Sequence, residues 1–299
     1  MKKIFFNDGQ LRNGWWIAIF IGLIIASQPI YKPLKNTLAG FGATETMLEL
    51  VSPMLIVLIT WICIKLRRET LKDVGLKLNL TWMKQLTAGL LVGSFALALV
   101  AGLIVIMGGV SFSINPQASF EVAFYGLYLF AIGSLLEELL HHGFIFQRLI
   151  DGIGEWPAQV LIGALFVFGH WGNPGMSGIT QVISSIDLFM GAIIFGLAYI
   201  KTNSLALPIG LHLGWNWMQG NILGFGVSGH DMTGLLTPEF HALPEWLTGG
   251  QFGPEASVVS LVVSSFILIY FAVWPGTIDD PKQQELDRIE RSVPLTVTD

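Results

Sequence analysis

Eight apolar stretches follow one another along this chain, and most are long enough to cross a lipid bilayer as helices. A helix rises 1.5 Å per residue, so a hydrocarbon core of ~30 Å needs about 20 residues. The chain is 53% hydrophobic and 12% charged, against about 25% charged residues in a soluble domain. We therefore expect an all-α, polytopic membrane protein, a bundle of eight transmembrane helices. The expected spans lie near residues 14–31, 46–66, 85–108, 121–147, 156–171, 181–200, 204–223 and 256–275.

The placement of lysine and arginine predicts how these spans are oriented. Cytoplasmic loops carry the excess of positive charge, and with eight spans and a cytoplasmic N-terminus only Lys32 and Lys35 fall outside. The segment 221–255 has no lysine or arginine, as expected of an outer loop. Both termini are predicted to be cytoplasmic. The predicted parts are helices 1–3 with a basic loop (1–112), helices 4–7 (113–225), and the outer loop, last helix and acidic tail (226–299).

Four titratable residues lie close together in the fourth predicted span. They are Glu137, Glu138, His141 and His142, and ionisable residues at membrane depth mark functional sites by default. Residues i and i+4 share a helix face, so Glu137 is expected to stack over His141 and Glu138 over His142. Two carboxyl groups this close in a low dielectric repel each other when both are ionised, so the pKa of at least one is expected to be raised. A raised pKa suits a carboxyl that acts as a general base near neutral pH.

Two later spans carry polar groups at a similar depth. The fifth contains Phe166 and His170, and the seventh contains His212 and Asn216 at i and i+4. At 1.5 Å per residue, Glu138, His212 and His170 lie roughly 15, 12 and 20 Å from the cytoplasmic ends of their spans. One site built from spans four, five and seven is therefore predicted, although His170 requires tilt or a late start of its helix.

These motifs resemble those of the CAAX prenyl endopeptidase and bacteriocin-processing (CPBP) intramembrane proteases, also called the Abi family. That family carries Glu-Glu-x-x-x-Arg, Phe-x-x-x-His and His-x-x-x-Asn on successive helices of an eight-helix bundle. This chain has Glu137-Glu138 followed by His142, then Phe166 to His170, and His212 to Asn216. This chain differs from the family motifs at one position, because His142 stands where the family has arginine. Arginine stays charged and binds a carboxylate bidentately, whereas the charge of histidine titrates around neutrality.

The resemblance implies an intramembrane endopeptidase that hydrolyses a peptide bond of a membrane-associated peptide or protein, prenylated or bacteriocin-like. It implies that Glu137 activates a water, that His170 orients this water, and that His212 and Asn216 stabilise the oxyanion. Glu138 would support the site, paired with His142, and Phe166 would be a supporting residue. The expected partners are this substrate and the lipid bilayer, with no nucleic acid. The expected location is multi-pass in a bacterial plasma membrane.

Other interpretations of the same residues stay open. Glu137, His170 and His212 could hold a zinc ion with an open fourth position, but Asn216 fits an oxyanion donor better than a metal ligand, which favours no obligatory metal. Glu138 and His141 have the Glu-x-x-His spacing of di-iron bundles, yet a second copy is missing, and a membrane desaturase needs more than six histidines. The main alternative is a non-catalytic family member that acts as a membrane immunity or scaffold protein.

Overall fold

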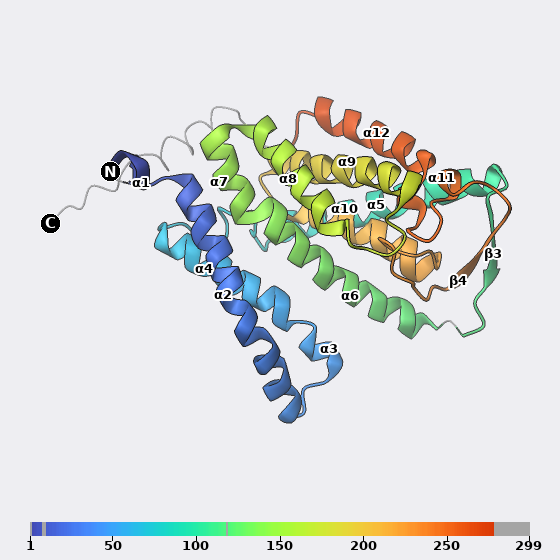
Figure 1. Ribbon diagram of the computed structural model, residues 1–299, viewed down its shortest axis with the longest axis horizontal. Coiled ribbons are helices and arrows are strands. Elements are labelled where there is room, and N and C mark those ends of the chain that lie inside the picture. Colours follow the sequence, from blue (N-terminus) through green and yellow to red (C-terminus); the bar gives the residue numbers. More distant parts are fainter. Residues whose placement is uncertain (1, 8–9, 118, 278–299) are drawn as a thin grey trace.

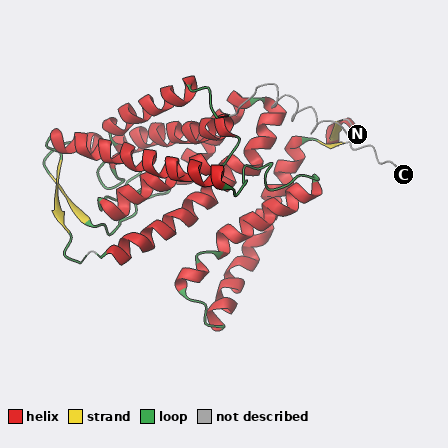
Figure 2. Ribbon diagram, turned by 180° about the vertical axis from the view of Figure 1, so that it is seen from behind, coloured by secondary structure: helices red, strands yellow, loops and turns green. Residues whose placement is uncertain are grey.

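The computed structural model describes residues 2–7, 10–117 and 119–277, and the described part is mostly helical (Figures 1 and 2). The elements, in chain order, are α1 Lys2–Phe5, β1 Phe6–Asn7, β2 Gln10–Leu11, α2 Asn13–Gly40, α3 Glu45–Leu48, α4 Val51–Leu66, α5 Leu80–Ile106, β3 Val110–Ile114, α6 Phe120–Glu138, η1 Leu139–Gly143, α7 Phe144–Ile153, α8 Glu155–His170, α9 Gly178–Thr202, α10 Ala206–Trp217, η2 Met218–Ile222, β4 Leu236–Phe240, α11 Glu245–Thr248, η3 Pro254–Ala256 and α12 Val258–Val273. The acidic tail predicted at the C-terminus lies outside the described residues.

Five helical segments of the described chain are long and apolar enough to cross a membrane. They are Asn13–Gly40, Glu45–Leu66, Leu80–Ile106, Phe120–Ile153 and Gly178–Thr202. Helices also occupy the three other predicted spans, but α8 and α12 have 16 residues each and α10 has 12. The count of eight spans, the cytoplasmic termini and the division at 112 and 225 therefore stay predictions.

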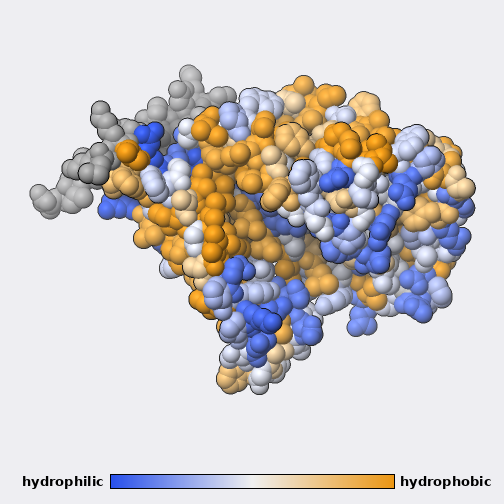
Figure 3. Space-filling view, viewed as in Figure 1, coloured by the Kyte–Doolittle hydropathy of each residue, from blue (hydrophilic) through white to orange (hydrophobic). Residues whose placement is uncertain are grey.

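Large apolar side chains cover much of the outer surface of these helices. Figure 3 shows hydrophobic surface over α2 and α12, whereas hydrophilic residues gather around α3 and toward β3 and β4. Exposed examples from five helices are Ile25, Leu58, Phe95, Phe168 and Phe266. Such side chains are costly in water and favourable in lipid, so the surface agrees with the composition.

Polar caps begin three of the long helices. The side chains of Asn79, Ser119 and Ser257 accept hydrogen bonds from the backbone N–H groups of Trp82, Val122 and Ser260, at 2.9, 3.3 and 3.0 Å. Each cap satisfies a donor that the first turn leaves unpaired. These caps begin α5, α6 and α12, which lie around the candidate site.

Helices α5 and α10 pack backbone against backbone through glycines. A Cβ on Gly89 would lie 2.5 Å from the carbonyl oxygen of Leu207, and Gly93 faces α10 in the same way. From the other side, Gly210 and Gly214 face the backbone of α5. Each helix thus has a Gly-x-x-x-Gly spacing, the arrangement that lets membrane helices approach closely. This contact holds α10, which carries His212 and Asn216, against α5.

The bundle has a basic end and a loop end. At the basic end, Glu69 accepts hydrogen bonds from Arg67 and Arg148, at 2.9 and 3.1 Å, and Lys201 bonds through its backbone to Thr277. The loop end carries residues 223–257 and the antiparallel pair β3–β4, in which Val110 is opposite Phe240; Figure 1 shows this pair at the right. The two strands were not expected in an all-α fold.

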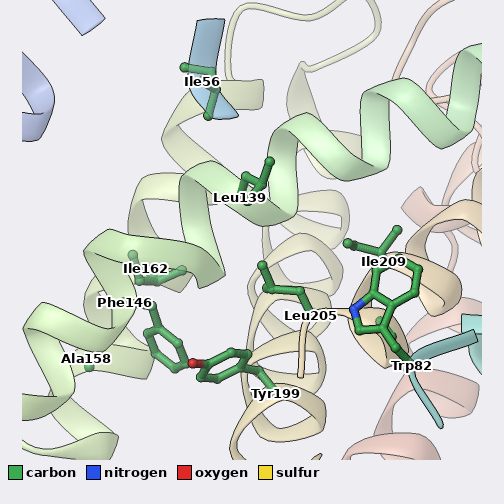
Figure 4. Close-up of a cluster of buried hydrophobic side chains, with 10 residues drawn as sticks. Ile56, Trp82, Leu139, Phe146, Ala158, Ile162, Tyr199, Leu205 and Ile209 are labelled. Carbon is green, nitrogen blue, oxygen red and sulfur yellow. The ribbon is translucent and has the colours of Figure 1, made fainter. Parts of the chain in front are cut away.

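The fourth predicted span is not one regular helix. Residues Leu139–Gly143 form a π-helical turn between α6 and α7, a feature often found at functional sites. Leu139 is fully buried in a cluster with Ile56, Phe146, Tyr199 and Leu205, and Figure 4 shows it between Ile56 and Leu205. This apolar cluster fixes the turn that carries both histidines of the span.

Candidate active site

A cavity of about 810 Å³ runs inside the bundle and receives residues from all three predicted motifs. Helices α5, α6, α8, α9, α10 and α12 all contribute to its wall. The site residues that line it are Glu137, Phe166, His170, His212 and Asn216. Glu138 and His142 lie behind this wall and are fully buried. The structure thus brings together the side chains that the sequence placed at similar depth, while their catalytic roles stay predictions.

Glu138 joins two histidines from different parts of the chain. Its Oε2 atom is 2.7 Å from Nδ1 of His142, and its Oε1 atom is 2.9 Å from Nδ1 of His212. The other ring nitrogen of His142, Nε2, lies 3.0 Å from the carbonyl oxygen of Ala192. The array links α6, the π-helical turn, α9 and α10. The predicted pairing of Glu138 with residue 142 is thereby present in the structure.

Hydrogen-bond accounting fixes where the protons of His142 lie. A carbonyl oxygen only accepts, so Nε2–H of His142 donates to Ala192. The short contact between Nδ1 and Glu138 then needs one further proton, shared between imidazole and carboxyl. His142 therefore satisfies the buried carboxyl of Glu138 through one shared proton, where arginine would offer a fork of several donors.

Two cavity histidines are held in one tautomer by backbone carbonyls. Nδ1–H of His170 donates to the carbonyl oxygen of Phe166 at 2.7 Å, and Nδ1–H of His141 donates to that of Glu137 at 2.9 Å. Their Nε2 atoms are then left to accept a proton or a hydrogen bond. The expected stacking of His141 on the Glu137 side chain is replaced by this backbone bond, because the π-helical turn alters the regular spacing.

Aromatic rings fix the orientation of the imidazoles. Phe166 lies 4.6 Å from His170, 5.1 Å from His141 and 6.3 Å from His212 between ring centroids. Phe195 of α9 stacks on His212 at 5.1 Å, with an interplanar angle of 11°. Stacked rings exclude water and limit rotation. Phe166 thus contacts three histidines, while its supporting role stays a prediction, and Phe195 was not predicted.

Glu137 presents an unsatisfied acceptor at this site. Its Oε2 atom is buried and has no hydrogen-bond partner among the described residues, and the nearest cationic group is Nε2 of His212 at 3.9 Å. Asn216 lines the same cavity. A buried acceptor without a partner is costly, so this atom is suited to receive a donor such as a water or a substrate N–H.

The predicted zinc ligands do not form a metal-binding cluster. Within residues 2–7, 10–117 and 119–277, no group of three or more His, Cys, Asp or Glu side chains is arranged to hold a metal ion. Glu137, His170 and His212 line one cavity without the convergence that a zinc site needs. No catalytic step is therefore derived through a metal.

Three serines also line the cavity outside the predicted motifs, Ser134, Ser228 and Ser264. Ser134 lies one turn before Glu137 and Glu138, and its hydroxyl is buried without a partner in the described chain. Ser264 of α12 donates to Asp187. Within the described chain none of the three serines is hydrogen-bonded to a histidine, the usual base for an attacking hydroxyl. Cys63 is buried in a separate apolar cluster with Phe20.

Comparison with known proteins agrees with the three motifs. Residues 119–218 match the family described as type II CAAX prenyl endopeptidase Rce1-like, a peptidase family, over about one third of the chain. No curated protein and no solved structure gives a significant match. The match runs from the N-cap of α6 into η2, so it covers every residue of the candidate site. The resemblance is confirmed for this segment, and with five apolar helices the chain is a multi-pass membrane protein.

Proposed function

We propose that this multi-pass membrane protein, with its Rce1-like segment at residues 119–218, is an intramembrane endopeptidase that uses water activated by a glutamate. The observation that carries the proposal is the unpartnered Oε2 atom of Glu137, in the same cavity as His170, His212 and Asn216. Amide hydrolysis requires a base, a positioned water and donors where negative charge develops. This set of side chains can supply all three.

The first step is attack of water on the scissile carbonyl. The water donates one hydrogen bond to the Glu137 carboxylate and the other to Nε2 of His170; this step uses the neutral ring, whose single proton is on Nδ1 and bonded to Phe166. Glu137 takes a proton as the water oxygen bonds to the carbonyl carbon, and the carbonyl electrons move to oxygen. The tetrahedral intermediate then carries one negative charge.

His212 and Asn216 stabilise that negative charge. Nδ1–H of His212 already donates to Glu138, so its Nε2 atom donates to the oxyanion only if the ring is cationic. Carboxylates at 2.9 and 3.9 Å favour this cationic form. The carboxamide of Asn216 supplies the second donor. Glu138 is a positioning residue in this scheme, because it orients His212 without contacting substrate.

Collapse of the intermediate completes the reaction. Glu137 returns its proton to the leaving nitrogen, the carbon–nitrogen bond breaks, and its electrons go to that nitrogen. The products are a carboxylic acid and an amine, and Glu137 is again ionised. No covalent enzyme intermediate forms, in keeping with cavity serines that have no histidine partner within the described chain.

The substrate is a membrane-associated peptide or protein. Phe130, Leu129, Leu188 and Ile194 give the cavity an apolar lining, which fits a chain that enters from lipid. The matched family's description names CAAX prenyl endopeptidases, so prenylated C-terminal peptides are the first substrates to test, followed by bacteriocin-like peptides. The bacterial plasma membrane remains the expected location.

Replacing Glu137 tests this proposal. Glu137→Gln removes the base while keeping the shape of the side chain, and we expect cleavage of a fluorogenic prenylated peptide to fall by about 10²–10⁴-fold. The control is Glu121→Gln, at an exposed position on the first turn of the same helix. Equal cleavage by both variants would refute the mechanism. A chain that cleaves none of the prenylated or bacteriocin-like peptides as wild type would instead be the immunity or scaffold protein.

A further inference from the structure

The loop end of the cavity is lined by hydrogen-bond acceptors that the proposed mechanism does not use. Asp187 comes from α9, Asn221 from η2 and Glu255 from η3, and all three line the cavity. Asp187, Asn221 and Glu255 are 7, 5 and 5% exposed, in that order. Two buried carboxyl groups and one amide oxygen thus face the same space from three separate segments.

Asp187 is bonded only through neutral hydroxyl groups. Ser264 and Ser260 of α12 donate to its Oδ1 and Oδ2 atoms at 2.8 and 3.0 Å. Within the described chain no lysine, arginine or histidine forms an ion pair with it. A buried carboxylate normally has a cationic partner or binds a cation, and the described residues supply no such partner to Asp187.

Glu255 is in a similar position. Its Oε1 atom accepts a hydrogen bond from the backbone N–H of Ser228, and it has no ion pair in the described chain. Burial raises the pKa of this carboxyl to about 7, and repulsion from Asp187 acts in the same direction. A cation placed between the two groups would relieve this repulsion and favour the ionised form of Glu255.

Asn221 supplies an independent acceptor. Its Nδ2 atom donates to the carbonyl oxygen of Thr233 at 3.3 Å, while its Oδ1 atom is buried and has no partner among the described residues. The carboxamide lies over Gly126, which also lines the cavity and has no Cβ to fill the space. An unpartnered amide oxygen calls for an N–H donor, as does each of the two carboxylates.

The described residues give the cavity no permanent positive charge. No lysine or arginine among them lines it, and Arg67, Arg148 and Lys201 lie at the opposite, basic end. Among the cavity histidines, His212 interacts electrostatically with Glu255 but its Nδ1–H is engaged by Glu138, and His230 is exposed. An anionic ligand would therefore meet unfavourable charge, and a cationic one would be attracted.

We propose that the loop end of the cavity is a subsite for a positively charged group of the peptide substrate, held by Asp187, Glu255 and Asn221. The group is a lysine or arginine side chain, or a free amino terminus. This inference rests on the proposed function, since it assigns part of the substrate to the same cavity. It predicts that substrates carry a basic residue on one side of the scissile bond, and that an acidic residue there is rejected.

The test compares charge at one substrate position. A fluorogenic membrane peptide is prepared in a series in which a single lysine, glutamine or glutamate is moved through the positions around the scissile bond. At the position that enters the subsite, we expect kcat/KM for lysine to exceed that for glutamate by ~10-fold or more, the ratio that 1.4 kcal/mol produces. Asp187→Asn and Glu255→Gln should each lower this ratio, and the double variant should lower it further.

A control and a binding measurement make the outcomes distinct. Glu239→Gln removes an exposed carboxylate of β4 outside the cavity and should keep the ratio. If Asp187→Asn does not fold, Glu255→Gln alone decides. A lysine-to-glutamate ratio near one at every position, or one that survives both substitutions, overturns the subsite while leaving the peptidase intact. If wild type cleaves nothing, binding of the same peptides, followed by fluorescence anisotropy, tests the subsite alone: lysine preference supports it, and equal binding refutes it.

Discussion

The hydrogen bonds of His142 allow a specific prediction, because its two ring nitrogens have different partners. Nδ1 shares a proton with Glu138 at 2.7 Å, and Nε2–H donates to the carbonyl oxygen of Ala192 at 3.0 Å. The amide nitrogen of asparagine lies about where Nδ1 lies, and that of glutamine about where Nε2 lies. His142→Asn therefore keeps a donor for Glu138, whereas His142→Gln keeps only the bond to α9.

The expected costs follow from what each variant leaves unpaired. His142→Asn strands a buried carbonyl oxygen, which costs about 1–3 kcal/mol. His142→Gln leaves the Oε2 atom of the fully buried Glu138 carboxylate unpaired, with only His212 still bonded to this group, and removing one partner of a buried ion pair costs about 3–5 kcal/mol. Adding Glu138→Gln to His142→Gln removes the charge of the Glu138 carboxylate, so the double variant should be more stable than His142→Gln alone.

The assay is the free energy of unfolding in detergent micelles, with SDS as the denaturant and tryptophan fluorescence as the signal. Wild type, His142→Gln, Glu138→Gln and the double variant form a double-mutant cycle, whose interaction term isolates the pair. Costs below about 1 kcal/mol for both single variants at His142 would contradict the reasoning. So would an additive cycle, because it would mean that Glu138 and His142 do not depend on each other.

Three further predictions concern packing, pH and the nucleophile. Gly93→Ala should destabilise by about 1–3 kcal/mol, because its Cβ meets the backbone of α10, whereas Gly102→Ala in the same helix meets nothing within 4 Å; equal unfolding curves would contradict the glycine contact. The folded pKa of Glu255, about 7, lies above its ordinary 4.5, so its contribution to stability is complete below pH 4.5 and lost as pH rises through 7. Glu255→Gln should therefore reduce the change of the unfolding free energy with pH between these values. A pH dependence unchanged from wild type would exclude the effect. Ser134→Ala should keep peptide cleavage within a few-fold of wild type, measured with the fluorogenic peptide, whereas loss comparable to that of Glu137→Gln would point to a serine nucleophile.

Hydropathy located every long helix of the described chain but not its details. A helix covers each predicted span, because apolar length is a local property. The first runs from Asn13 to Gly40 and includes Pro29 and Pro33, so it extends well beyond the predicted residue 31. The β3–β4 pair joins residues more than a hundred positions apart, and short strands with distant partners leave no local periodicity. The π-helical turn at Leu139–Gly143 was also missed, since it depends on packing around Leu139.

The sequence identified the candidate site residues better than the contacts among them. The Glu138–His142 pair follows from i, i+4 spacing, and the meeting of Glu138 with His212 agrees with the similar depths predicted for them. The carbonyl oxygen of Ala192 could not be predicted, because a backbone acceptor has no residue signature. Phe195 resembled any other apolar residue of its span. The paired Gly-x-x-x-Gly spacings at Gly89 and Gly210 were readable, and would have indicated that α5 and α10 are neighbours.

The glycine contact between α5 and α10 has a consequence for how the protein responds to its bilayer. Side chains can slide past one another, but backbones in direct contact have few alternative registers, so we expect the two helices to tilt together. A bilayer that thins or thickens makes helices tilt at a modest cost per ångström. In Figure 1 the lower ends of α2 and α4 lean away from the helices around the cavity. Adjustment to lipid thickness is therefore expected in that outer pair, while the depth of His212 and Asn216 beside α5 stays constant among membranes of different composition.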